Sequence, residues 1–380
     1  MSWEYVTLDK LGTVSRGKSK HRPRNDKVLF GGKYPFVQTA DVKAAGLYLT
    51  EYTDTYNERG LEQSKLWQEG TLCITIAANI ADTAILGIDA CFPDSIMGFV
   101  PCEGVSNVKF VKYAFDVLQR DCKKISQGTA QDNLSWKKLS TIKFPAPPIE
   151  IQDKIVEVLS AYDNLIENNQ KQIKLLEEAA QRLYKEWFVD LRFPGYEDVA
   201  VVDGVPEGWS KKLIDNVIGK VDRSKQIKTA DYLNEGSIPV IDQSRDFIAG
   251  YTNDAEALVN IDCPVIIFGD HTRILKYIQF PFAKGADGTQ LIVSINENMP
   301  QSLLYCSLIA IDLSNYHYAR HFKYLKAESI LVPTKEIADK FDCIVSLILQ
   351  KTQKIRDMSY KAVQARDRLL PKLMSGELEV

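Results

Sequence analysis

The sequence contains one match to a phosphate-binding pattern. Gly12, Gly17, Lys18 and Ser19 have the spacing G-x-x-x-x-G-K-[ST], in which backbone N–H groups and the lysine hold nucleotide phosphates. Such a loop needs an apolar strand before it and a helix directly after it, because the N–H groups at the helix N-terminus bind the phosphates. Here a mixed polar segment precedes the pattern, and Pro23 falls where the helix should run. We therefore predict a basic loop and not a nucleotide site.

Two basic segments occupy matching positions in the chain. Residues 15–27 hold six Lys or Arg against one acid, a local net charge of +5, and residues 219–228 hold four against one, a local net charge of +3. At an offset of 206 residues, Gly12 and Gly17 face Ile218 and Arg223, so the glycines are not retained and only the basicity is. A single basic run is most simply a solvated loop, but two at equivalent places favour contact with DNA phosphates. The phosphate-contact candidates are Arg16, Lys18, Lys20, Arg22, Arg24, Lys220, Arg223, Lys225 and Lys228.

No catalytic or metal-binding constellation is found. The sequence lacks H-E-x-x-H, G-x-S-x-G, G-x-G-x-x-G after a strand, and the [DN]-P-P-[YF] motif with which amino-methyltransferases hold a flipped base. The 7 cysteines form no C-x-x-C pair, and among the 4 histidines only His317 and His321 share a helical spacing. Two histidines without a third ligand do not make a metal site. We expect no catalytic residue, metal ion or cofactor in this chain.

Composition is that of an ordinary globular protein. Hydrophobic residues make up 45% of the chain and charged residues 26%. The net charge of −3 argues against a protein that coats nucleic acid indiscriminately, since such binding requires bulk positive charge. No apolar run approaches the roughly 20 residues that cross a bilayer, and the N-terminus lacks the features of a signal peptide. We expect a cytoplasmic protein that does not contact a membrane.

Two long helices are predicted, one over residues 147–190 and one over residues 333–376. In each segment, apolar or small residues recur three and four positions apart, which is the pattern of a helix packed against another helix. Each helix alone would expose its apolar stripe, so we expect the two to pair in antiparallel fashion. The predicted interface residues are Ile155, Tyr162, Ile166, Asn169, Ile173, Leu176, Leu183, Trp187, Phe341, Ile344, Ile348, Ile355 and Leu369.

The segments before the two helices resemble each other. Trp3 matches Trp209 at an offset of 206, and Pro145 matches Pro333 at an offset of 188, so the second copy is predicted to be 18 residues shorter. Short runs of β-branched and aromatic residues, broken by Gly, Pro, Asn and Asp, indicate twisted α/β (α+β) domains. The predicted fold has two similar domains separated by two long antiparallel coiled-coil helices, as a pseudo-twofold internal repeat. The expected divisions are 1–146, 147–190, 191–332, which includes a connector, and 333–376.

The sequence resembles the specificity subunit of a type I restriction-modification system. The resemblance is carried by residues 128–188, by the connector "RFPGYE…VPEGW", by "RHFKYLK" at 320–326 and by "LLPKLMSGEL" at 369–378. It implies two target recognition domains, each of which reads one half of a split sequence in double-stranded DNA, with paired helices setting the gap. It also implies partners: two methyltransferase subunits with S-adenosylmethionine, and restriction subunits with ATP and Mg²⁺. The chain itself would then be a non-catalytic subunit.

The residues that read bases cannot be carried over by motif, because recognition domains of this family differ with their targets. We expect base contacts from side chains that form paired hydrogen bonds at strand ends and turns, although each could equally be a satisfied turn residue. These candidates are Gln38, Gln243, Arg245, His271 and Arg273, and Lys323 is a further DNA-contact candidate. Two other functions were weighed: a coiled-coil adaptor that binds proteins without regard to DNA sequence, and a P-loop ATPase that depends on Lys18.

Overall fold

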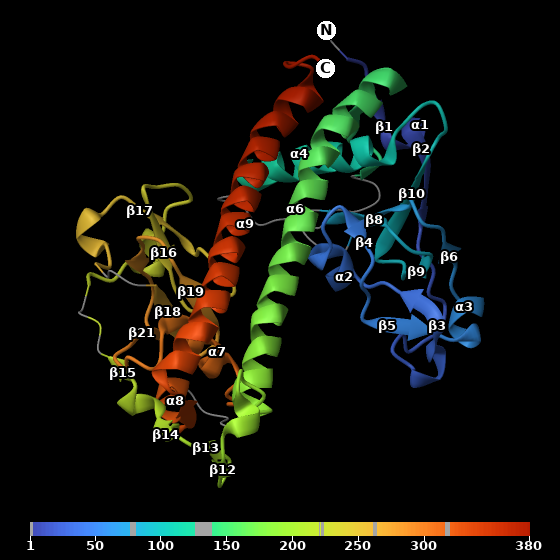
Figure 1. The fold of residues 1–380 in the computed structure, drawn as a ribbon. Helices are drawn as coiled ribbons and strands as arrows, with labels where there is room; N and C mark the ends of the chain where they lie inside the picture. The colour runs from blue at the N-terminus through green and yellow to red at the C-terminus, as the bar shows by residue number, and fades with distance from the viewer. Residues whose placement is uncertain are drawn as a thin grey trace. The chain divides into compact units, whose positions relative to one another are not determined.

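The computed structural model describes residues 3–76, 81–125, 139–219, 221, 224–260, 264–315 and 320–380. The chain forms two compact units (Figure 1). Unit 1 consists of Met1–Glu167 with Tyr360–Val380, and unit 2 consists of Asn168–Ser359. Each unit therefore takes one part of the long helix α6 (Ile149–Tyr184) and one part of the long helix α9 (Lys335–Ser375).

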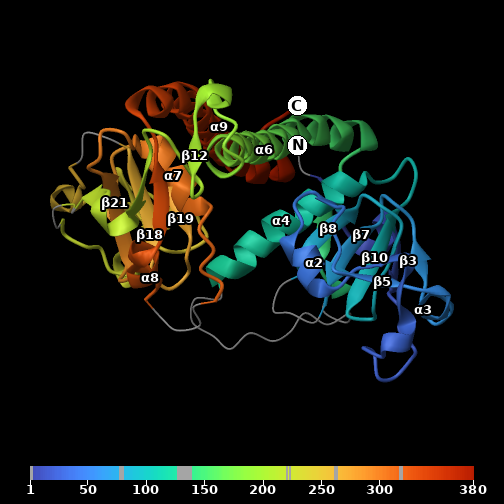
Figure 2. The same cartoon turned by 60° about the horizontal axis from the view of Figure 1, so that its bottom comes forward.

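Unit 1 is a mixed α/β unit with two main sheets. A five-stranded sheet has the order β2-β10-β7-β8-β4, a four-stranded sheet has the order β5-β3-β9-β6, and β1 pairs with β11. Helix α4 packs against β8 (Figure 2). The elements are β1 (Tyr5–Thr7), α1 (Leu8–Leu11), β2 (Gly12–Arg16), η1 (Lys27–Leu29), β3 (Phe30–Phe36), α2 (Thr39–Ala44), β4 (Tyr48–Leu49), β5 (Asp54–Tyr56), α3 (Glu58–Glu62), β6 (Leu66–Trp67), β7 (Leu72–Thr75), β8 (Thr83–Leu86), β9 (Ala90–Cys91), β10 (Ile96–Pro101), α4 (Val108–Ile125) and β11 (Lys143–Pro145).

Unit 2 repeats this plan with shorter strands. A four-stranded sheet has the order β15-β21-β18-β19, a three-stranded sheet has the order β17-β16-β20, and β14 pairs with β22. Helices α7 and α8 pack against the first of these sheets. The elements are η2 (Lys185–Val189, a π-helical turn), η3 (Tyr196–Asp198), β12 (Val201–Val202), β13 (Val205–Pro206), β14 (Ser210–Leu213), η4 (Ile214–Asn216), β15 (Ile218–Gly219), η5 (Thr229–Asp231), β16 (Ile238–Ile241), β17 (Gly250–Thr252), η6 (Ala255–Ala257), β18 (Val265–Gly269), β19 (Leu275–Ile278), β20 (Ala283–Lys284), β21 (Thr289–Ser294), α7 (Gln301–Ile309), α8 (His321–Ala327) and β22 (Ser329–Val332).

The two units share one strand topology, which confirms the predicted internal repeat. The order β2-β10-β7-β8 in unit 1 corresponds to β15-β21-β18-β19 in unit 2. In the second sheet, β3 pairs antiparallel with β5 and parallel with β9, and β16 pairs in the same two ways with β17 and β20. Parallel pairing requires a crossover connection, so its recurrence at the same place is a strong sign of duplication.

The strand registers correct the length of the repeat. Val6 pairs with Phe144 in unit 1, and Lys212 pairs with Ile330 in unit 2. The first partners are 206 residues apart and the second are 186 apart, so the second copy is shorter by 206 − 186 = 20 residues. The predicted 18 was wrong because it matched Pro145 with Pro333, whereas both sequences have prolines two residues apart or nearby. At 186 residues, the starts of α6 and α9 also coincide.

The two long helices pair within each unit, as Figure 1 shows. In unit 1, Ile155 and Leu159 of α6 share a buried cluster with Leu370 and Leu373 of α9. In unit 2, Phe341 of α9 packs against the rings of Tyr184, Trp187 and Phe188, with ring centroids 5.0–6.4 Å apart. Neither α6 nor the first 36 residues of α9 contain Gly or Pro, so the helical hydrogen bonds run without a break.

Most predicted interface residues lie on the buried or half-buried stripe, but Ile344 does not. Ile344 is 43% exposed, whereas its neighbour Val345 is fully buried, as are Phe341 and Leu349 four residues to either side. The spacing 341-345-349 continues the helix face better than 341-344-348. The prediction of a helix contact for Ile344 was therefore wrong. Ile155, Asn169, Trp187 and Ile355 are buried, and Tyr162, Ile166, Ile173, Leu176, Leu183, Ile348 and Leu369 are half-buried.

Candidate nucleic-acid interface

The basic loop of unit 1 leaves strand β2 and is held by backbone contacts. The Gly17 N–H donates to the Ile96 carbonyl at 2.8 Å, and the Lys18 N–H donates to the Phe92 carbonyl at 3.1 Å. An added Cβ at Gly17 would lie 2.2 Å from the Pro93 carbonyl oxygen, so the chain approaches its neighbour too closely for any other residue. Because these amides already have acceptors and no helix follows, the segment does not have the geometry of a phosphate loop.

The end of helix α3 fixes the next part of the loop. The side-chain oxygen of Gln63 accepts from the N–H groups of Lys20 and His21, at 2.7 and 3.0 Å. The Ser64 hydroxyl donates to the Lys18 carbonyl at 2.8 Å. These contacts bridge more than 40 residues of sequence, so the loop is ordered by the fold and not by its own sequence.

The cations of this loop fall into two groups. Arg16, Lys18 and Lys20 are exposed, and no ion pair joins them to another described residue. Arg24 instead lies 2.7 Å from the Asp94 carboxylate, and the Arg22 guanidinium donates to the Ser19 and His21 carbonyls at 2.7 and 2.8 Å. The first group is free to contact an anionic partner, while the second shapes the loop.

The basic segment of unit 2 is partly described. Lys220 and Arg223 lie outside the described residues. Lys225 lies 2.7 Å from the Asp254 carboxylate and 3.5 Å from that of Glu256, and the hydrogen bond from Asp254 raises the pKa of this lysine. Lys228 is exposed, and no ion pair joins it to another part of the described chain. In this segment, Lys228 is therefore the described cation that remains available to a partner.

Gln38 serves the local structure of unit 1. Its backbone N–H donates to the Asp41 carboxylate at 2.7 Å in a capping box at the start of α2, and its side-chain amide donates to Asp54 at 2.7 Å. A base contact by Gln38 would compete with the Asp54 contact.

Gln243, His271 and Arg245 come together in unit 2. The Gln243 side-chain oxygen accepts from the His271 backbone N–H at 3.0 Å, and its NH₂ group donates to the Asp287 carbonyl at 2.8 Å. The side chains of Arg245 and His271 are exposed, with no hydrogen bond or ion pair to another described residue. Arg273 follows on the same hairpin with φ of +61°, a backbone conformation that favours glycine. Lys323 is exposed on α8.

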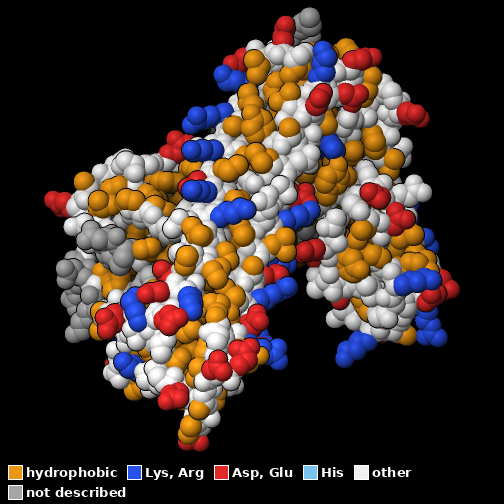
Figure 3. All heavy atoms as spheres, viewed as in Figure 1, with side chains coloured by type: hydrophobic (Ala, Val, Ile, Leu, Met, Phe, Trp, Pro, Cys, Tyr) orange, Lys and Arg blue, Asp and Glu red, His pale blue; other side chains and the backbone are white. Residues whose placement is uncertain are grey.

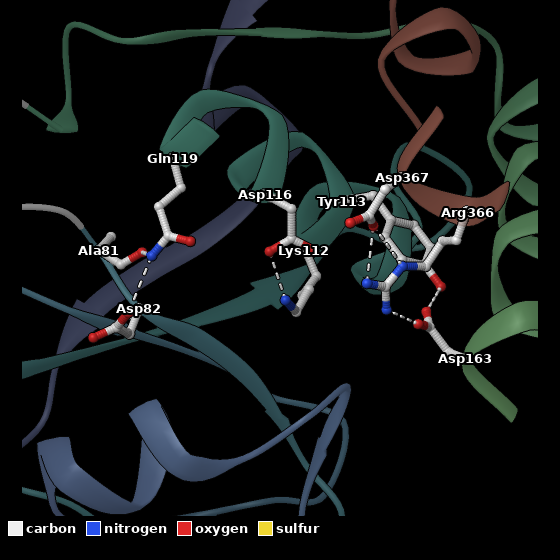
Figure 4. A network of polar contacts seen from close by, with 9 residues as sticks. All are labelled: Ala81, Asp82, Lys112, Tyr113, Asp116, Gln119, Asp163, Arg366 and Asp367. Atoms are coloured by element: carbon white, nitrogen blue, oxygen red, sulfur yellow. Dashed lines mark hydrogen bonds and ion pairs between the residues drawn. The ribbon is translucent and has the colours of Figure 1, made fainter. Parts of the chain in front are cut away.

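A polar network joins three helices in unit 1 (Figure 4). The Tyr113 hydroxyl of α4 donates to one oxygen of Asp163 of α6 at 2.5 Å, and Arg366 of α9 donates to the other at 2.6 Å. Arg366 also pairs with Asp367 at 2.9 Å. Nearby, burial raises the pKa of Asp116, which pairs with Lys112 at 2.6 Å. The network fixes the register of α6 against α9.

Sequence reasoning missed this network and one buried lysine. Asp163 and Arg366 are 203 residues apart, and nothing in either local sequence marks the contact. Lys276 of β19 is 4% exposed, although it stands in an ordinary strand pattern.

Within the described ranges, no group of three His, Cys, Asp or Glu side chains could hold a metal ion. The ring nitrogen Nδ1 of His321 instead lies 2.9 Å from the Asp270 carbonyl oxygen, and the predicted partner in spacing, His317, lies outside the described residues. No helix among the described residues is long and apolar enough to cross a bilayer.

Comparisons with known proteins identify the class. A family model for the type I restriction modification DNA specificity domain matches residues 1–178. The MjaIX specificity subunit of Methanocaldococcus jannaschii, a type I restriction enzyme subunit, is 25% identical over 410 aligned residues, which cover 100% of this chain and 94% of the relative. The EcoR124I/EcoR124II specificity subunit of Escherichia coli is 30% identical over 102 residues, which cover 24% of this chain and 25% of the relative.

A solved structure shares the fold. The type I restriction-modification S subunit from M. genitalium has a TM-score of 0.61 at 16% identity, with 98% of this chain and 96% of that chain covered. The duplicated fold and the full-length match thus define a DNA specificity protein. The chain belongs to the family of type I restriction-modification specificity subunits.

Proposed function

We propose that this specificity subunit reads a bipartite DNA target, one half-site with each unit. The observation that carries the proposal is the shared strand topology of the two units, each of which has a basic loop directly after the equivalent strand, β2 or β15. The free cations, including Arg16, Lys18 and Lys228, would contact phosphates and fix the orientation on the duplex. Exposed polar side chains at strand ends would read base edges.

We further propose that the chain catalyses no reaction and acts with partner subunits. Two methyltransferase subunits would bring S-adenosylmethionine, and restriction subunits would bring ATP and Mg²⁺. Support for docking comes from α6 and α9, which expose Leu165, Leu175, Leu347 and Met358 by 38–64%. Apolar side chains are visible among charged ones along the two helices in Figure 3. Apolar residues on an otherwise polar helix face are typical of a protein interface.

The test is DNA binding by this chain, co-expressed with its cognate methyltransferase subunit, across a randomised duplex library at two salt concentrations. We expect enrichment of two short half-sites at one fixed separation, with affinity that falls steeply as salt rises. Binding without base preference would refute the proposal and favour a coiled-coil adaptor.

A further inference from the structure

Lys276 is a buried lysine that holds a loop of unit 2. Its ammonium group donates to the carbonyl of Asp242 at 2.8 Å and to the carbonyl of Asp246. The side chain is 4% exposed, and burial lowers the pKa of its ammonium group. Burying an amine is costly unless its donors find acceptors, so an apolar residue would be the simpler choice in this strand. The arrangement thus ties both ends of residues 242–246 to the sheet.

The other unit shows that the fold itself does not need this lysine. Strand registers place Ala84 of unit 1 at the position of Lys276: Ala84 pairs with Cys73, which pairs with Gly98, and Lys276 pairs with Ile267, which pairs with Leu291. Ala84 is fully buried. In unit 1 the segment after β3 is the capped helix α2, whereas the segment after β16 is an irregular turn. Lys276 therefore serves the turn that is particular to unit 2.

Gln243 connects this turn to two other loops. Besides its contacts with His271 and Asp287, its backbone carbonyl accepts from the Thr272 hydroxyl at 2.7 Å. Gly288 has φ of +83°, and an added Cβ there would lie 2.7 Å from the Gln243 amide nitrogen. The loops at 242–246, 270–274 and 285–288 thus form one hydrogen-bonded cluster. Arg245 and His271 are its exposed side chains without a hydrogen bond or ion pair to another described residue.

We propose that Lys276 and Gln243 are positioning residues that hold this cluster in a single arrangement, and that Arg245 and His271 are the specificity-determining residues it presents to DNA base edges. The inference rests on the proposed function, because it assigns the base contacts of one half-site to unit 2. Arg245 can form paired hydrogen bonds with guanine, and His271 has a ring nitrogen for a single one. Bidentate readout needs side chains fixed to fractions of an ångström, which a loop held only at its ends does not provide.

The experiment repeats the library selection with Lys276→Met, Gln243→Glu, Arg245→Ala and His271→Ala, each in complex with the methyltransferase subunit. Lys276→Met keeps the length and apolar stem of the side chain but removes both donors. Gln243→Glu keeps the acceptor for His271 and removes the donor to Asp287. Lys228→Met is the matched control, since it removes an exposed lysine of the same unit that has no tie to the cluster.

We expect the first four variants to relax base preference by about tenfold at the half-site of unit 2 only. The other half-site reports whether the complex is intact, because loss of fold would weaken both. Lys228→Met should lower affinity for all sequences and leave base preference unchanged.

Unchanged preference at both half-sites in Lys276→Met and Gln243→Glu would overturn the positioning role. Unchanged preference in Arg245→Ala and His271→Ala would overturn the assignment of the base contacts. Should Lys276→Met fail to fold, Gln243→Glu decides, because that side chain lies at the surface of the cluster. A wild-type selection without two half-sites would instead refute the proposed function, and this inference with it.

Discussion

Positive charge in residues 15–27 is divided between two tasks at the scale of single side chains. Lys18 projects into solvent while its carbonyl and N–H groups are held by Ser64 and Phe92. Arg24 spends its charge on Asp94 inside the same loop. A sequence count of cations therefore overstates the charge that a DNA phosphate meets.

Substituting these two cations separately tests the division. Lys18→Ala should weaken DNA binding evenly across sequences and reduce the slope of log affinity against log salt by about one, because one phosphate contact is lost. Arg24→Ala should change the slope less, since Asp94 already neutralises the guanidinium. The measurement is equilibrium binding over a series of salt concentrations. Equal slopes for the two variants, or ATP hydrolysis that depends on Lys18, would contradict this account.

Single residues are where the sequence was least informative. The rejection of a phosphate loop followed from Pro23, and the structure agrees because no helix follows the loop. Whether Gln38 or Gln243 is free depends on partners 16 and 44 residues away, which no local pattern encodes. The role of Lys276 depends on a strand pairing and was invisible for the same reason.

At the scale of elements, the long helices were the most predictable part of the chain. Their 3.6-residue periodicity extends over ten turns, so errors in single positions average out. The choice between Ile344 and Val345 could not be made this way, because both are apolar and neighbouring positions differ by only 100° around the helix. Packing against Tyr184, Trp187 and Phe188 turns Phe341, and hence Val345, inward.

This pair of neighbours gives a direct test of the helix face. Val345→Ala should destabilise the α9 portion of unit 2 by about 2 kcal/mol, because it leaves a cavity in a buried cluster. Ile344→Ala should change stability by less than about 0.5 kcal/mol, as is usual for exposed positions. Hydrogen exchange of the α9 amides measures both. The reverse ranking would place Ile344 in the helix contact after all.

The network between α4, α6 and α9 should be a stability determinant of unit 1. Asp163→Ala removes the acceptor of Tyr113 and the partner of Arg366 together, and both groups are largely shielded from water. We expect a loss of about 3 kcal/mol in the opening free energy of α4 and α6, measured by hydrogen exchange. The control is Asp339→Ala, which removes only a surface pair with Lys335 and should cost less than about 0.5 kcal/mol. Similar losses in both variants would show that the network is not specific.

At the scale of the whole molecule, the duplication is the organising feature. Two copies of one topology, each completed by part of α6 and part of α9, allow each unit to vary its recognition loops without altering its frame. The capped helix α2 in unit 1 and the turn held by Lys276 in unit 2 are two solutions at the same place. Sequence similarity revealed the duplication because the frame, unlike the loops, is built from recurring apolar patterns.

Matched insertions in the two long helices test whether they set the spacing of half-sites. One heptad is inserted between Glu167 and Asn168 of α6, and another between Ser359 and Tyr360 of α9. Asp163 with Arg366 lies on one side of both insertions and Glu177 with Arg356 on the other, so both ion pairs keep their register. A heptad nearly restores the helix face and adds about 10 Å of length.

At 3.4 Å for each base step, we expect the enriched gap between half-sites to grow by about three base pairs, while the half-site sequences stay the same. Library selection reads both quantities in one experiment. An insertion in α6 alone should abolish selection of a single spacing, because it offsets the α6 register in one unit from that in the other. An unchanged gap after the matched insertions would mean that the helices join the units without measuring the distance along DNA.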